Sequence, residues 1–265
     1  MKKTFVQGII TILLFFGTWF TLSQINWVKT LNIRQVTNKT EQKLGDLYWS
    51  VFKNTEKDNN NPYVVLSIDS IVTHLCKANQ IDRNYIQVHV FNNDEINAFA
   101  LPNGHLIICK GLILDSDNQE ELTGVISHEI AHIELNHVMK KLITEVGLSV
   151  LVSITTGSGG SEIIKETAKV LSSTAFDRKL EKEADIKAVD YMLNAQVNPK
   201  PFADFLYKLS DSNSEHPDYL QWIRSHPESK ERAEYILEYS NSKETEYKHI
   251  LSDDTWSKLK EKLTE

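Results

Sequence analysis

The distribution of apolar and polar positions predicts an apolar N-terminal segment, a short region of strand and a long helical remainder. Residues 9–20 are mainly apolar and have no polar face. Residues 39–52 and 68–78 repeat apolar positions at helical spacing, whereas residues 85–91 alternate between apolar and polar. These patterns predict two amphipathic helices followed by one strand.

Two short apolar runs come next and predict a β-hairpin. They cover residues 97–101 and 105–109, and the tripeptide Pro102-Asn103-Gly104 separates them. Asn and Gly accept the left-handed backbone conformations that tight turns need. We therefore expect the two runs to pair as antiparallel strands.

After this hairpin the pattern becomes helical almost to the end of the chain. The capping-box spacing of Asp117 and Glu120 predicts the start of a long helix that continues past His137. The glycine-rich residues 157–161 interrupt the helical region and predict a flexible joint or a mobile loop. A charged helix is expected over residues 244–263.

The predicted order, a small early sheet followed by helices, is typical of the α+β class. We expect one mostly helical domain over residues 45–265, and the sequence contains no internal repeats. A polar tether at residues 29–44 precedes this domain, and residues 1–28 contain a hydrophobic segment.

The N-terminal segment has the features of a signal anchor or a signal peptide. Lys2 and Lys3 precede a stretch without charged residues that ends at Lys29, and residues 4–22 are just long enough to span a membrane as a helix. No small-x-small cleavage site follows, which favours an uncleaved single-pass anchor over a removed signal peptide. The lysine pair favours a cytoplasmic N-terminus. We therefore expect a periplasmic domain in the cell envelope, either membrane-anchored or exported after cleavage.

Composition limits the classes of partner. The 265-residue chain has a formal net charge of −7, with 41% hydrophobic and 25% charged residues, which is ordinary for a globular protein. The acidic balance offers no basic field to offset phosphate repulsion, so we expect no nucleic-acid partner. Two cysteines, Cys76 and Cys109, are too few for a disulfide framework or a cysteine zinc site. A single disulfide and two half-buried thiols are the alternatives for them.

The motif His128-Glu129-Ile130-Ala131-His132 is the clearest candidate for catalytic chemistry. Two histidines four residues apart lie on one face of a helix, so their imidazoles can bind one ion. Glu129 lies one step round the helix, where it can reach a water molecule beside the metal without binding the metal itself. The flanking residues are apolar and contain no proline, which favours a buried helix over a chance match in a loop.

A catalytic zinc site needs a third protein ligand and an open position for water. The metzincin pattern is absent because His137 falls one position early, and we expect His137 to be structural or at the surface. Glu181 and Asp185 have i, i+4 spacing, so one helix face presents two carboxylates. One could bind zinc while the other accepts a proton from a ligand imidazole. A solvated charged face is the alternative interpretation of this segment.

Three blocks in this order resemble the zinc metallopeptidase family that includes HtpX, BepA and the CAAX prenyl proteases, which is of the gluzincin type. Residues 97–104 are similar to the family's edge-strand motif, residues 128–132 to its zinc helix and residues 181–185 to its third-ligand motif. The resemblance extends from about Gly45 to Arg232. It implies a minigluzincin-like metalloprotease fold, closest in architecture to the BepA-like branch.

The resemblance also implies roles for single residues. One Zn²⁺ per chain would be bound by His128, His132 and Glu181, with Asp185 supporting the ligands. Glu129 would act as the general base that activates water. The expected reaction is therefore hydrolysis of peptide bonds by a zinc metalloendopeptidase.

A weaker match is the segment Ser225-His226-Pro227, which is followed by Arg232. In the BepA-like branch a histidine in such a segment can approach the zinc and hold the enzyme latent, and in relatives equivalent groups assist the transition state. We expect His226 near the metal in one of these roles, and a hydrogen-bonded histidine at the entry of a helix is the alternative. His216-Pro217 has the same form without the following arginine, and we interpret it as a loop.

The resemblance to the edge-strand motif implies a mode of substrate binding. Asn97, Ala98, Phe99 and Ala100 are expected to bind an extended peptide as an added strand, which selects unfolded segments. The expected substrates are misfolded or misassembled envelope proteins, and the expected role is protein quality control. A latent metal-binding factor with chaperone-like activity is a second hypothesis. A structural membrane-anchored protein with an accidental motif is a third.

Overall fold

A computed structural model of the chain describes residues 33–211, 220–227, 229–241, 243 and 246–264. The predicted N-terminal hydrophobic segment and the loop predicted at His216 lie outside the described residues. No helix in the described part of the chain is long and apolar enough to cross a membrane. The chain divides into two units, residues 1–40 and residues 41–265, and the second unit carries the candidate site.

Both helices predicted before the sheet are present and are longer than expected. Helix α3 covers Ile33–Thr55 and helix α4 covers Pro62–Asn79. Residues 33–44, for which the sequence predicts part of a polar tether, are helical instead. The reason is visible at Leu44, which is fully buried and belongs to the hydrophobic core, so α3 is a packed element there.

Three short strands form the predicted small sheet. Strands β1 (Gln87–Phe91), β2 (Ala98–Leu101) and β3 (His105–Cys109) are arranged in the order β1-β3-β2. Strand β2 pairs with β3 in antiparallel fashion, which confirms the hairpin, and β1 pairs with β3 in parallel.

The hairpin turn uses the backbone freedom that its sequence predicts. Asn103 and Gly104 have φ values of 63° and 72°, both in the left-handed region. A Cβ atom on Gly104 would lie 2.1 Å from the carbonyl oxygen of Tyr85, so only glycine fits there. The turn thereby fixes the register in which Leu101 faces His105.

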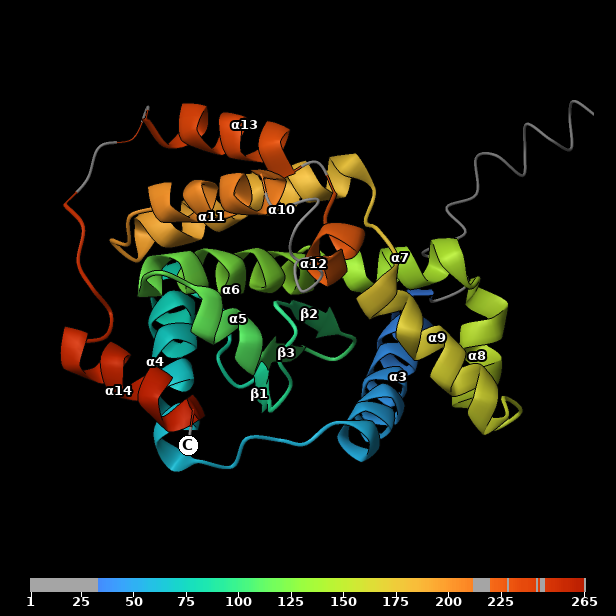
Figure 1. Ribbon diagram of the computed structural model, residues 1–265. Helices are drawn as coiled ribbons and strands as arrows, with labels where there is room; N and C mark the ends of the chain where they lie inside the picture. The colour runs from blue at the N-terminus through green and yellow to red at the C-terminus, as the bar shows by residue number, and fades with distance from the viewer. Residues whose placement is uncertain (1–32, 212–219, 228, 242, 244–245, 265) are drawn as a thin grey trace, which may run out of the picture. The chain divides into compact units, whose positions relative to one another are not determined.

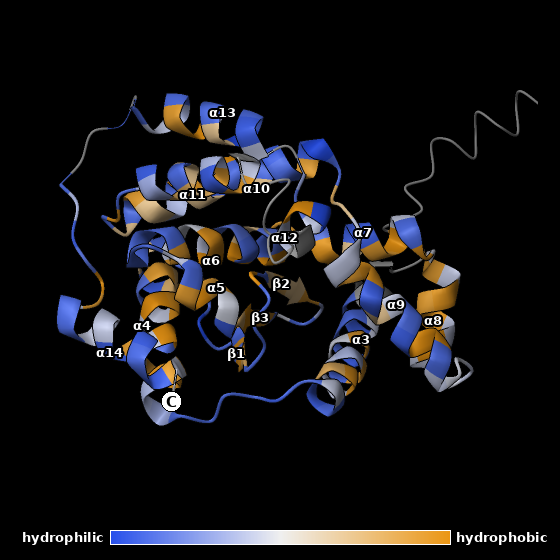
Figure 2. Ribbon diagram, viewed as in Figure 1, coloured by the Kyte–Doolittle hydropathy of each residue, from blue (hydrophilic) through white to orange (hydrophobic). Residues whose placement is uncertain are grey.

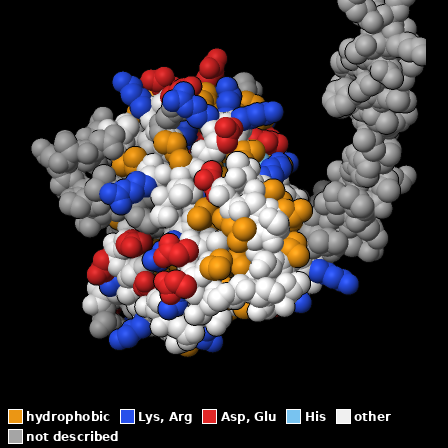
Figure 3. All heavy atoms as spheres, turned by 90° about the vertical axis from the view of Figure 1, so that its right-hand side faces the viewer, with side chains coloured by type: hydrophobic (Ala, Val, Ile, Leu, Met, Phe, Trp, Pro, Cys, Tyr) orange, Lys and Arg blue, Asp and Glu red, His pale blue; other side chains and the backbone are white. Residues whose placement is uncertain are grey.

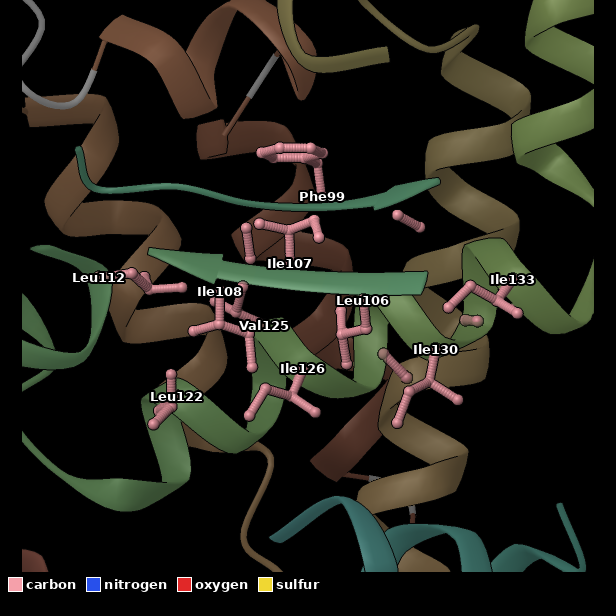
Figure 4. Close-up of a cluster of buried hydrophobic side chains, with 14 of the residues drawn as sticks. Phe99, Leu106, Ile107, Ile108, Leu112, Leu122, Val125, Ile126, Ile130 and Ile133 are labelled. Atoms are coloured by element: carbon pink, nitrogen blue, oxygen red, sulfur yellow. The ribbon is translucent and has the colours of Figure 1, made fainter. Parts of the chain in front are cut away.

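The two faces of the sheet have different neighbours. Figure 4 shows Leu106 and Ile108 directed toward α6, where they meet its apolar side chains. Phe99 and Ile107 point to the opposite face. Strand β2 therefore has side chains on both faces of the sheet and borders both sets of neighbours.

Helix α6 (Gln119–Glu134) carries the histidine motif, but its ends differ from those predicted. Asn118, not Asp117, is the N-cap, and its side chain accepts a hydrogen bond from the Glu121 backbone N–H. The Glu121 carboxylate in turn accepts from the Asp117 N–H, so the capping residues lie one position later than expected. The helix also does not continue past His137. Asn136 takes a left-handed conformation with φ 56° and starts a new helix, α7 (His137–Glu145).

The remaining helices complete the domain. Helix α5 follows β3, and α8 and α9 are separated by the glycine-rich residues 157–160, which interrupt the helical region as predicted. Their bounds are α5 Lys110–Asp115, α8 Leu148–Thr155, α9 Ser161–Ser173, α10 Arg178–Asn194, α11 Lys200–Asp211, α12 Leu220–Ser225, α13 Ser229–Asn241 and α14 Asp253–Thr264. The charged helix predicted over residues 244–263 therefore begins only at Asp253, and its earlier start is wrong.

Within the second unit, α6 lies between two layers. Figure 1 shows α10, α11 and α13 on one side of α6, and the sheet with α4 on the other. Gly124 permits close packing of α6 on α11, since a Cβ atom there would lie 2.3 Å from Phe202. The fold is thus mostly helical α+β with a small early sheet, as the sequence predicts.

Both cysteines are buried free thiols rather than a disulfide pair. Cys76 lies in α4 and Cys109 ends β3. Burial raises the pKa of the Cys76 thiol to about 11, so this group stays protonated and unreactive at neutral pH.

Helices α7, α8 and α9 leave some apolar surface exposed. Helix α8 contains no charged residue and is mainly hydrophobic in Figure 2. Ile143, Val150 and Ile163 are exposed on these three helices. Figure 3, which faces the right-hand side of Figure 1, shows hydrophobic side chains gathered on this face. Exposed apolar side chains are common on folded proteins and by themselves assign no partner.

Candidate metal centre

The two motif histidines face each other from successive turns of α6. The Nε2 atoms of His128 and His132 are 3.0 Å apart, and both side chains are fully buried. The spacing of four residues places them on one face, as predicted for a pair that binds one ion. Phe176 stacks on the His132 ring with centroids 4.0 Å apart and limits its orientation.

Helix α10 brings a carboxylate to the same point. Glu181 Oε1 lies 3.3 Å from His132 Nε2, and Glu181 Oε2 lies 3.7 Å from His128 Nε2. Asp177 caps this helix by accepting from the Lys179 N–H, so Glu181 falls in the first turn. The predicted pair Glu181 and Asp185 is therefore buried on one face of α10, and the solvated-face alternative is wrong.

The far nitrogens of the two histidines have their own partners. His128 Nδ1 lies 2.8 Å from Asp185 Oδ1, and His132 Nδ1 is hydrogen-bonded to His137 Nδ1 at 3.1 Å. Such contacts fix the rings and leave both Nε2 atoms directed at Glu181. His137 is buried and structural, one of the two possibilities expected for it.

Arg232 from α13 compensates the buried negative charge. Its Nε and Nη2 atoms each donate to Asp185 at 2.8 Å, and its Nη1 lies 2.7 Å from Glu181 Oε2. Tyr235, one turn further along α13, donates its hydroxyl proton to Asp185. The arrangement is a bidentate pair, the geometry in which a buried arginine binds a carboxylate most strongly.

His226 enters the cluster from the segment after α12. Its Nδ1 lies 3.0 Å from Glu181 Oε1 and 3.2 Å from His128 Nε2. Its Nε2 lies 3.4 Å from Glu129 Oε1. Trp222 stacks on the ring with centroids 4.2 Å apart, and the side chain is fully buried.

Burial sets the charge states of the histidines. Burial lowers the pKa of His132 to about 3, with His128 adding to the effect. It also lowers the pKa of His226 to about 4, although Glu181 acts in the opposite direction. Neutral imidazoles are the form that binds metal ions.

The carboxylates behave differently from one another. Burial raises the pKa of Glu181, but the charges of Arg232 and His226 outweigh it and hold the pKa well below its usual value. Burial and the charge of Glu181 raise the pKa of Glu129 well above its usual value, while the Ala100 backbone N–H acts in the opposite direction. A raised pKa is what a group that exchanges protons near neutrality needs.

The donor set fits a zinc ion. His128, His132, Glu181 and His226 each offer one ligand atom, and these atoms lie within 4.8 Å of one another. Two or three neutral imidazoles with one carboxylate are ligands that zinc prefers. Neither oxygen of Glu129 has a well-formed hydrogen bond among the described residues, although the side chain is fully buried. A buried carboxylate without such a partner is consistent with a site built to hold a further group.

The predicted substrate-binding residues lie on the edge strand β2. Cys109 N–H donates to the Asn97 carbonyl, so this pair is hydrogen-bonded in the ladder. Because hydrogen-bonded and non-hydrogen-bonded pairs alternate, the backbone polar groups of Ala98 and Ala100 face the free edge. The influence of the Ala100 N–H on Glu129 agrees with this placement. The Asn97 side chain is fully buried, and its amide has no well-formed hydrogen bond among the described residues, although it acts on the Glu95 carboxyl and lowers the pKa of that group.

Several residues around the cluster were not predicted from the sequence. Tyr235, Phe176 and Trp222 contact Asp185, His132 and His226 respectively. Tyr235 lies three residues after Arg232, so helical spacing could have placed both on one face. Phe176 lies far from His132 in sequence, and no local pattern marks it. Trp222 lies four residues before His226, a spacing that could have placed the two side chains on one helix face.

A buried helix with His-Glu-x-x-His, joined by a carboxylate from a second helix, defines the site of a metallopeptidase. Comparison with known proteins agrees with this class. The profile of peptidase family M48 matches residues 64–240. The chain belongs to this family.

Individual relatives match over most of this chain. It is 30% identical over 207 residues to the mitochondrial metalloendopeptidase OMA1 of Bos taurus, covering 70% of this chain and 39% of that protein. It is 27% identical over 218 residues to the beta-barrel assembly-enhancing protease of Escherichia coli (strain K12), covering 76% and 43%. It is 27% identical over 165 residues to the metalloprotease LoiP of the same strain, covering 60% and 64%. The chain thus spans less than two thirds of the length of each relative.

Proposed function

We propose that this chain is a zinc-dependent metalloendopeptidase that hydrolyses peptide bonds in extended or misfolded proteins of the cell envelope. The observation that carries the proposal is the convergence of His128, His132 and Glu181 beside the buried carboxylate of Glu129. Membership of peptidase family M48 supports the reaction class.

His128, His132 and Glu181 would hold the ion through two imidazole nitrogens and one carboxylate. When bound, zinc supplies a Lewis acid that polarises a carbonyl and lowers the pKa of water. Asp185 orients His128 through the 2.8 Å contact to its Nδ1. Glu129 takes a proton from the attacking water and passes it to the departing amine.

The substrate would bind as an added strand along β2. The free-edge groups of Ala98 and Ala100 can pair with an extended peptide, and Ala100 lies beside Glu129. Asn97 and Phe99 flank these positions. An added strand must be unpaired before it binds, which favours unfolded or misassembled proteins as substrates.

The substitution Glu129→Gln tests this function. It removes the proton acceptor but keeps the shape, so we expect about one zinc per chain and a loss of cleavage of roughly a hundredfold to ten-thousandfold on an unstructured protein. Glu134→Gln, on the exposed face of the same helix, is the matched control and should cleave at the wild-type rate. Cleavage retained by Glu129→Gln would remove this residue from its role.

A specific observation favours a second candidate function, a latent quality-control factor. His226 offers a fourth donor to the same point, and a site with four protein ligands keeps no position open for water. All four donor residues are buried, with exposures of 0–2%. If the purified protein is inert, His226→Ala should increase cleavage. An unchanged rate would count against latency through this residue, and a lower rate would make it a catalytic group.

We also propose that residues 1–28 anchor the chain in a membrane, with the domain outside the cytoplasm. The support is the uncharged apolar stretch in the sequence. Extraction of membranes at high pH tests this: an anchored chain stays in the pellet, whereas a chain cleaved after export is released.

A further inference from the structure

A pocket of about 420 Å³ lies between the end of α3, the connection from β1 to β2, and α9. Its apolar wall includes Phe52, Phe91, Phe99 and Ala168. The rings of Phe52 and Phe99 are 5.2 Å apart and tilted by 49°. The volume and the aromatic wall are typical of a ligand-binding cavity.

One residue, Phe99, belongs both to the edge strand β2 and to the wall of this pocket. Phe99 lies in β2 between Ala98 and Ala100, whose backbone groups face the free edge. Its side chain forms part of the pocket wall. The strand that would bind a peptide backbone is therefore also the strand that borders this cavity.

The side chains of an added strand alternate between the two faces of the sheet. Residues on the face of Leu106 and Ile108 would point toward α6 and the metal centre. Residues on the face of Phe99 would point the other way, toward the pocket (Figure 4). One side chain of a bound segment is thus directed away from the reacting bond and into this cavity.

The charges at the rim balance. The charged lining residues are Glu56 and Glu95, together with Lys165 and Lys169 of α9. Burial raises the pKa of Glu95, and the charge of Glu56 adds to the effect. The rim has no net charge to select a charged side chain, whereas the wall is apolar and aromatic.

We infer that this pocket is a substrate subsite that takes one large apolar or aromatic side chain from the segment bound along β2. The inference rests on the proposed function and adds a sequence preference to it. The enzyme would then favour segments that carry an apolar residue at a fixed distance from the cleaved bond. Such residues are exposed when a protein is unfolded.

Peptides that differ at one position, scanned on both sides of the cleaved bond, test the subsite with the zinc-loaded full chain. We expect kcat/KM to be about tenfold higher for Phe or Leu than for Gly at one position. Thr55 is exposed on the pocket rim, so Thr55→Trp should fill the cavity and reduce this ratio to within about twofold. Asn54→Trp, on the exposed neighbouring residue outside the pocket, should keep it.

Binding of the same peptides to zinc-loaded Glu129→Gln, measured by fluorescence anisotropy, separates the subsite from turnover. A binding preference for Phe or Leu that is lost in Thr55→Trp would support the subsite. It would do so even if the wild-type chain cleaved no peptide, because a lack of cleavage would count only against the proposed function. A preference unchanged in Thr55→Trp would overturn the inference, and so would the absence of any preference in both cleavage and binding.

Discussion

Among the described residues, histidine rings pack together in two places, and their surroundings differ. The helix cluster consists of His128, His132 and His226, and the carboxylates of Glu181 and Asp185 approach it to within 2.8–3.7 Å. Its ring nitrogens converge on one point. Negative charge from α10 therefore meets neutral imidazoles from two other segments.

The sheet cluster consists of His89 and His105, which lie on adjacent strands and pack against Trp49 of α3. His89 Nε2 is 2.9 Å from His105 Nδ1, and the Trp49 ring stacks on His89 with centroids 3.6 Å apart. Among the described residues, no carboxylate forms an ion pair with either ring. The charge of exposed Asp46 acts on His105 and raises its pKa, but burial outweighs it.

We infer that packed histidines without a convergent carboxylate do not form a metal centre. Burial lowers the pKa in both clusters, to about 4 for His89 and about 3 for His132. The helix cluster differs from the sheet cluster because it has two carboxylates. Glu181 points at the histidine nitrogens, and Asp185 orients the His128 ring. We therefore expect changes in the helix cluster to affect metal binding and changes in the sheet cluster to affect only stability.

The largest expected effect is that of Glu181→Gln on metal affinity. Zinc sites gain about 10–16 kcal/mol from four ligands, so loss of one ligand should weaken binding by about a hundredfold or more. Competition with a chelating dye measures this change. His105→Gln in the sheet cluster is the matched control and should leave the affinity unchanged. Equal zinc binding by Glu181→Gln and the wild-type chain would contradict the difference between the clusters.

A smaller effect is expected when Arg232 is replaced. Arg232→Met leaves Asp185 and Glu181 buried without their cation, which should lower the free energy of unfolding by about 3 kcal/mol. Urea unfolding of the metal-free protein measures it. Lys243→Met removes a partly exposed ion pair with Asp190 and should cost less than about 1 kcal/mol. If both variants lost a similar free energy of unfolding, Arg232 would not be the residue that stabilises the buried carboxylates.

The smallest effect concerns acid stability in the sheet cluster. Burial, His105 and Lys53 lower the pKa of His89 from its ordinary value of 6.5 to about 4. The unfolded chain binds this proton first, so stability falls as the pH drops from about 6.5 to 4. His89→Phe keeps the stacking on Trp49 and should reduce that loss by about 1–2 kcal/mol after allowance for partial exposure. Parallel pH profiles of unfolding for the two proteins would contradict this assignment.

Local patterns predicted the elements that carry the site. His128 and His132 are four residues apart, and so are Glu181 and Asp185. Because residues at this spacing lie on one face of a helix, the grouping of each pair follows from the sequence. That α6 and α10 meet is a tertiary contact, which the spacing of Glu181 and Asp185 left open and the family resemblance favoured. The contact of Phe176 with His132 had no local signal.

The errors have physical causes that are not local. The break at Asn136 depends on one residue that adopts a left-handed conformation, which asparagine permits but does not require. The charged helix starts late because Gln119 accepts hydrogen bonds from the Ile250 and Leu251 N–H groups, and His249 Nδ1 lies 2.7 Å from Glu120 Oε1. These contacts hold residues 246–252 outside a helix, and charge patterning cannot predict them.

The most direct test of the central claim is a crystal structure of the zinc-loaded chain with anomalous data collected at the zinc absorption edge. We expect one peak about 2 Å from His128 Nε2, His132 Nε2 and a carboxylate oxygen of Glu181. A peak elsewhere, or one that leaves Glu181 beyond bonding distance, would contradict it.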